Sequence, residues 1–95
     1  MYLPIKLSDT AQATLTSVIN YIDSINKIGA GEKWYNRFKK KLLRYTFAKK
    51  YPLCRIKDFA VNGYSCISIN DWVIIFKIEN DTFMIQYIIY GSLLY

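Results

Sequence analysis

The 95-residue chain contains no histidine, and it has only two cysteines, four glycines and two prolines. The absence of histidine excludes Ser-His-Asp and Cys-His catalysis, histidine-ligated metals and a pH switch based on imidazole. Two distant cysteines and scattered aspartates supply no zinc or calcium ligand set, so we expect no metal and no cofactor. Cys54 and Cys66 form no CxxC motif, and we interpret them as reduced thiols.

Long hydrophobic runs are also missing. The longest unbroken apolar segment runs from Trp72 to Phe76, far short of the roughly 20 residues that a membrane span requires. The first residues show no basic segment followed by an apolar one, as a signal peptide would. We therefore expect a cytoplasmic protein without membrane association. With 53% apolar residues, the composition predicts a single folded domain over residues 1–95.

The positive charge is concentrated in one part of the chain. The net charge is +6, yet residues 33–57 carry ten basic residues and no acidic one, whereas the remainder carries three basic and seven acidic residues. Such a block is either a solvated helix face or a docking surface for something anionic, a nucleic acid or an acidic protein. The basic residues that we expect to bind a partner are Lys33, Arg37, Lys40, Arg44, Lys49 and Lys50.

The first half of the chain predicts one strand and two helices. Alternation over residues 3–7 indicates a short strand. Asp9, as an N-cap with Gln12 three residues later, begins a helix whose apolar positions recur every three or four residues, and glycines at 29–31 end it. A second helix over 32–50 separates an apolar stripe from a basic stripe. The short connection between the helices favours an antiparallel hairpin.

The second half predicts strands. Residues 55–60 form either a short strand or an irregular link, and strands follow over 64–69, 72–79 and 83–90, joined by tight turns. The order β-α-α-β-β-β predicts an α+β fold with a helical hairpin on one face of a small antiparallel sheet, in which the first strand pairs with later ones. The inward face is drawn from the following residues, with the alternate set left open: Ile67, Ile69, Val73, Ile75, Ile85 and Ile88.

This pattern resembles the RelE/ParE superfamily of toxins from type II toxin–antitoxin, or plasmid stabilisation, systems. The resemblance covers nearly the whole chain. It lies in Ala11, Leu15, Val18 and Tyr21-Ile22 of the first helix, in Lys49-Lys50 before Pro52, and in the last two strands with the Tyr90-Gly91 end. It implies a toxin that an acidic antitoxin wraps and inactivates.

The family resemblance implies one of two activities. RelE-like members cut messenger RNA in the ribosomal A site, whereas ParE-like members bind and poison DNA gyrase without covalent chemistry. A serine, Ser65, stands where the nuclease branch usually has an arginine, and a hydroxyl cannot stabilise a pentavalent phosphate as a guanidinium does. We therefore predict a ParE-like toxin that acts by protein binding, with a RelE-like endoribonuclease or a decayed toxin that only binds a partner as alternatives.

If the chain is a nuclease, few residues remain for its chemistry. Arg55 and Lys57 are the candidates for phosphate contact, and Tyr90 is the candidate proton donor. Residues like Arg55 and Lys57 are more often solvated link residues, and a tyrosine like Tyr90 more often anchors the end of a sheet. The chain is also rich in tyrosine, and we expect Tyr35, Tyr51, Tyr64 and Tyr95 to serve as aromatic anchors at an interface.

Overall fold

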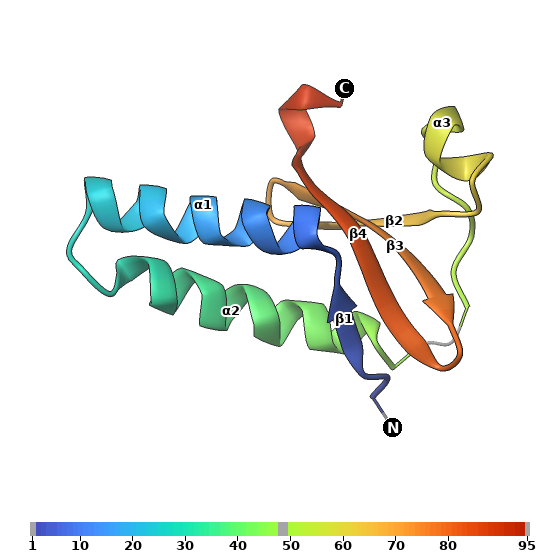
Figure 1. The fold of residues 1–95 in the computed structure, drawn as a ribbon, viewed down its shortest axis with the longest axis horizontal. Helices are drawn as coiled ribbons and strands as arrows, with labels where there is room; N and C mark the ends of the chain where they lie inside the picture. The colour runs from blue at the N-terminus through green and yellow to red at the C-terminus, as the bar shows by residue number, and fades with distance from the viewer. Residues whose placement is uncertain (1, 48–49, 95) are drawn as a thin grey trace.

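The computed structural model describes residues 2–47 and 50–94, which form two long helices packed on a four-stranded sheet (Figure 1). The elements are β1 (Ile5–Leu7), α1 (Asp9–Ile25), α2 (Ala30–Tyr45), α3 (Lys57–Ala60), β2 (Ser65–Ile69), β3 (Trp72–Glu79), β4 (Thr82–Tyr90) and a 3-10 turn, η1 (Gly91–Leu93). This is the predicted α+β fold, with α3 added. No helix in the described ranges has the length and apolar character needed to cross a membrane.

The sheet is mixed rather than antiparallel throughout. Its strand order is β1-β4-β3-β2, and β2, β3 and β4 form the expected antiparallel meander. β1 instead pairs with β4 in parallel, with Ile5 opposite Phe83 and Leu7 opposite Ile85, so the prediction of an antiparallel sheet is wrong for this pair. Three helices and two strands separate β1 from β4 in the chain, so no hairpin turn fixes their relative direction.

A β-bulge in β4 sets which side chains face the helices. Ile75 lies opposite Tyr87, but the next residue, Phe76, lies opposite Ile85, which leaves Gln86 as the extra residue. Without a bulge, side chains three residues apart on a strand point to opposite faces. The extra residue restores the phase, so that Ile85 and Ile88 are both buried in the core between sheet and helices.

The core settles which alternate set of strand residues points inward. Leu15, Phe38 and Leu42 of the helices form one buried cluster with strand residues of a single face. The strand residues in this cluster are Ile67, Ile69, Ile74, Phe76, Phe83, Ile85 and Ile88. Val73 and Ile75 are buried but lie outside it, because the side chains of β3 alternate across the sheet. On that opposite face, the ring of Phe59 in α3 lies 5.9 Å from that of Tyr87.

The start of α1 is capped one residue earlier than the sequence predicts. Ser8, not Asp9, is the N-cap, and its Oγ accepts a hydrogen bond from the backbone N–H of Ala11 at 3.0 Å. The same hydroxyl donates to the carbonyl of Gln86 at 2.5 Å. One side chain thus fixes the helix start and ties it to the bulge of β4.

The glycines at 29–31 begin α2 rather than ending α1, which stops at Ile25. Gly29 precedes α2 with φ of 97°, a conformation that glycine adopts without strain. The carboxylate of Asp23 accepts hydrogen bonds from the N–H groups of Gly29 and Gly31, at 3.1 and 2.9 Å. Asp23 therefore caps α2 from the neighbouring helix.

The segment after α2 differs most from the prediction. α2 ends at Tyr45 rather than near residue 50, and the buried Thr46 donates its hydroxyl to the carbonyl of Leu43 at 2.7 Å. Residues 57–60 form a helix, neither the strand nor the irregular link that we expected. Because the N–H of Leu3 bonds the carbonyl of Thr46 at 3.0 Å, the chain is already held to the N-terminal segment where the helix stops.

The cysteines are joined, which contradicts the prediction of reduced thiols. Cys54 and Cys66 form a disulfide with their Cα atoms 4.8 Å apart. The N–H of Cys54 bonds the carbonyl of Tyr64 at 2.9 Å and thereby brings this segment beside β2. The disulfide depends on this tertiary contact, which no local sequence motif predicts.

We predict that Gly31→Ala destabilises the protein by about 1–3 kcal/mol. Alanine normally stabilises a helix relative to glycine by about 1 kcal/mol, but a Cβ at residue 31 would overlap the backbone carbonyl of Ile19 where the two helices meet. Urea unfolding should therefore show that Gly31→Ala lowers the free energy of unfolding, whereas a glycine-to-alanine change in a helix normally raises it. Ala13→Gly, on the exposed side of α1, is the control and should lose about 1 kcal/mol. A Gly31→Ala protein as stable as the parent would contradict the close helix approach.

Candidate functional site

The outer side of α2 carries a continuous cationic face, which we define as Lys33, Arg37, Lys40 and Arg44. All four are exposed, while Phe38 and Leu42 on the same helix are buried against the sheet. At about 100° per residue, spacings of four, three and four place the cations on one stripe, opposite the buried positions. The structure therefore gathers four of the six predicted partner-binding residues on one surface.

The other two predicted partner-binding residues are not on this face. Lys50 lies beyond the end of α2 and lines a cleft described below, and Lys49 lies outside the described residues. Two further lysines of α2 flank the cationic face. Lys39 holds its ammonium 5.0 Å from the centre of the Tyr35 ring, and Lys41 donates to the side-chain oxygen of Asn70 at 2.6 Å.

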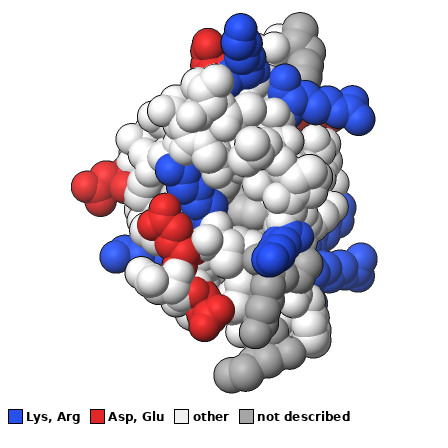
Figure 2. All heavy atoms as spheres, turned by 90° about the vertical axis from the view of Figure 1, so that its right-hand side faces the viewer, with Lys and Arg blue, Asp and Glu red and all other residues white. Residues whose placement is uncertain are grey.

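Charge is also unevenly distributed on the end of the molecule that carries α3 and the turn between β3 and β4. Figure 2 shows basic side chains over most of this end, including its right margin, whereas most of the acidic ones lie in its left half. An uneven field of this kind orients an approaching charged partner.

An apolar groove borders the edge strand β1, and we call it the β1 groove. It has a volume of about 440 Å³. Its apolar lining comes from both helices and from β1, and consists of Ile5, Leu7, Leu15, Tyr35, Phe38 and Leu42. Lys6 and Lys39 stand at the same groove. Since β1 forms one edge of the sheet, the groove offers unpaired backbone groups beside apolar surface and positive charge.

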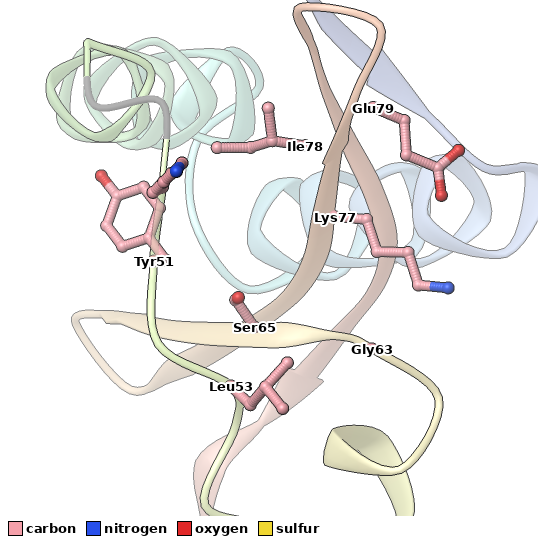
Figure 3. A pocket seen from close by; sticks show the side chains of 8 residues that line it. Tyr51, Leu53, Gly63, Ser65, Lys77, Ile78 and Glu79 are labelled. Atoms are coloured by element: carbon pink, nitrogen blue, oxygen red, sulfur yellow. The ribbon is translucent and has the colours of Figure 1, made fainter.

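A second cleft, the linker cleft, lies where the chain leaves α2 (Figure 3). Its volume is about 450 Å³. One wall is the segment of Lys50, Tyr51 and Leu53, and the opposite side is β3 with Lys77 and Glu79. Ser65 of β2, only 8% exposed, points its hydroxyl into the space between them. Lys77 and Glu79 point away from this hydroxyl, so the cleft gathers no cluster of cations around it, and it presents no guanidinium to stabilise a pentavalent phosphate.

The catalytic candidates are not brought together. Arg55 lines a cavity of about 240 Å³ beside the disulfide, and Lys57 is the first residue of α3. Tyr90 ends β4, packs its ring 5.2 Å from that of Trp72 and lines a different cavity of about 260 Å³. In the described part of the chain, no three Cys, Asp or Glu side chains are grouped to bind a metal. This geometry does not assemble an acid, a base and a phosphate contact in one place.

The tyrosine anchors fall into different environments. Tyr35 lines the β1 groove. Tyr64 lies beneath Lys77, whose ammonium is 4.4 Å from the ring centre. Tyr51 instead packs against Phe76 at 5.2 Å and is a structural residue. Tyr95 lies outside the described residues.

Sequence reasoning missed Lys77 and the β1 groove. Lys77 joins the linker cleft because β2 and β3 pair with Ser65 opposite Phe76, a register that could have been derived from the tight turn between these strands. The groove depends on β1 lying at the sheet edge beside β4, which no local pattern encodes.

Comparisons with known proteins give no assignment: the chain matches no protein-family model, and no curated protein matches it significantly.

We predict that Tyr51→Phe lowers stability by about 1 kcal/mol, because the hydroxyl donates to the carbonyl of Tyr45 at 2.5 Å. Burial, and to a lesser extent the neighbouring Tyr45, raises the pKa of Tyr51 above its ordinary value. The folded state therefore favours the neutral phenol, and this contribution is lost as the pH rises through about 10 and above. Unfolding followed from pH 8 to 11 should show a steeper loss in the parent than in Tyr51→Phe; equal slopes would contradict it.

Proposed function

We propose that the chain is the toxin of a type II toxin–antitoxin system, acting by protein binding in the manner of ParE and silenced by an acidic antitoxin. The observation that carries the proposal is the β1 groove with Lys6 and Lys39 at its border; the cationic face lies on the other side of α2. Lys39 borders the groove on the same helix that carries Arg37 and Lys40. Apolar surface, an unpaired strand edge and positive charge thus lie within reach of one extended segment.

An acidic, partly disordered antitoxin segment suits these features. Its apolar side chains would fill the groove over Leu15 and Leu42, and its backbone would pair with the edge of β1. Its carboxylates would lie near Lys6 and Lys39 at the groove. Such a segment folds as it binds, so buried apolar area and strand pairing must offset the cost of ordering it.

The gyrase-directed activity needs a rigid surface and no catalytic residues. The separation of Arg55 and Tyr90 in different cavities supports this branch over the nuclease branch. The helical face of α2 is a suitable docking element because buried Phe38 and Leu42 fix it against the sheet.

The RelE-like endoribonuclease is the alternative activity. Lys50 and Lys77 both line the linker cleft and would be its phosphate contacts there, although Lys77 points away from the hydroxyl of Ser65. A decayed toxin that retains only partner binding would keep the β1 groove and lose toxicity.

Induced expression of the chain without a partner should arrest growth. A gyrase poison traps broken DNA, so arrested cells should become filamentous and show DNA damage, which microscopy and a DNA-break assay measure. Purified ribosomes carrying message should remain uncut. Ribosome-dependent cleavage would establish the nuclease instead, and normal growth would favour the decayed toxin.

Charge reversal of Arg37, Lys40 and Arg44 to glutamate should weaken binding of the acidic antitoxin that the proposal requires by at least about tenfold, or about 1.4 kcal/mol. Each change on an exposed surface should alter stability by under about 0.5 kcal/mol, so the thermal midpoint should shift by only a few degrees. Calorimetry measures the affinity.

Lys27→Glu, near the tip of the hairpin and exposed, is the charge control and should leave the affinity within about twofold. Unchanged affinity in the triple variant would remove the cationic face from the mechanism. The double variant Arg55→Ala/Lys57→Ala separates the two activities, because it should leave a gyrase poison toxic and impair a nuclease.

A further inference from the structure

The Cys54–Cys66 disulfide holds a segment that otherwise has few attachments. Residues 50–56 run between α2 and α3 without helix or strand. Tyr51 anchors the first part through its hydrogen bond to Tyr45 and its packing on Phe76. The later part is held by the disulfide and by the bond from the N–H of Cys54 to the carbonyl of Tyr64.

The same segment forms one wall of the linker cleft. Leu53 lines the cleft, is 60% exposed and directly precedes Cys54 (Figure 3). The opposite side belongs to β3, whose residues are held by pairing with β2 and β4. The two sides of the cleft therefore differ: one is part of the sheet, and the other is fastened at its far end by a bond that can be reduced.

A reductant can reach this bond. A cavity of about 240 Å³ opens beside the disulfide, lined by residues that include Arg55, Cys54, Cys66 and Ser68. Cys54 is only 7% exposed, whereas Cys66 is partly exposed, so an incoming thiolate meets Cys66 more readily. Arg55 lines the same cavity, and a nearby cation favours the thiolate that leaves.

We infer that the Cys54–Cys66 disulfide is a redox latch on the linker cleft. When the bond is intact, the wall at Leu53 is fixed against β2. When it is reduced, the wall is released and the cleft widens, while the sheet and the helical hairpin keep their structure. This inference does not rest on the proposed toxin function, because it concerns the shape of the cleft alone.

We take a dithiol as the reductant. Its thiolate attacks the sulfur of Cys66, which forms a mixed disulfide and releases Cys54 as a thiolate. The second thiol of the reductant then attacks the mixed disulfide and releases Cys66. Two electrons pass to the protein, the dithiol becomes a cyclic disulfide, and two protons end on the two cysteines.

Hydrogen exchange of the full-length protein, with and without dithiothreitol, tests the latch. Mass spectrometry after thiol alkylation should find no alkylated cysteine before reduction and two after it. Reduction should speed exchange at the amide of Cys54 by at least about tenfold, because its hydrogen bond to the carbonyl of Tyr64 loses its covalent support. The amides of Ile74 and Ile75 in β3 should exchange as before, and reoxidation should restore protection.

The double variant Cys54→Ser/Cys66→Ser is the control, since dithiothreitol should not change its exchange. Two alkylated cysteines in the untreated protein would overturn the inference. Unchanged exchange at the amide of Cys54 after reduction would overturn it too, because the segment would then be held without the disulfide. A rise that also includes β3 would assign the disulfide a general stabilising role and would likewise overturn the latch.

Discussion

The fold depends on the bulge at Gln86, where three requirements meet. The extra residue rephases β4, so that Phe83, Ile85 and Ile88 all enter the core beneath the helices. The carbonyl of Gln86 accepts a hydrogen bond from the hydroxyl of Ser8, the residue that caps α1. Beside it, the N–H of Ser8 bonds the carbonyl of Ile85 at 2.9 Å and continues the parallel pairing of β1. A single backbone irregularity thus aligns the sheet, the first helix and the edge strand.

Burial of the apolar sides determines where the charge lies. Because Phe38 and Leu42 face the sheet, the helical repeat places the cations of α2 on the opposite, solvent-exposed side. The stacked rings of Phe76 and Phe83, 4.2 Å apart, fill the core below. The cationic face and the β1 groove are consequently two results of the same packing, and substitutions that loosen the core would alter both.

Local patterns predicted the elements well and the long-range contacts poorly. The limits of β3 and the three antiparallel strands follow from apolar runs and tight turns, and Lys33 to Arg44 form the expected stripe. The direction of β1, the cap by Ser8, the short α3 and the disulfide all depend on partners distant in sequence. The β1 groove shares this origin, since it requires β1, α1 and α2 to assemble first.

The helical hairpin reaches well past the sheet, as Figure 1 shows, and its tip has little to pack against. Ile28 is 96% exposed, and Ile25 at the end of α1 is 61% exposed. The outer turns are therefore supported mainly by the contact between the two helices, closed by Asp23. This end can accept a fluorophore or an inserted peptide without disturbing the strands. A label attached there would report on the molecule while the sheet keeps its structure.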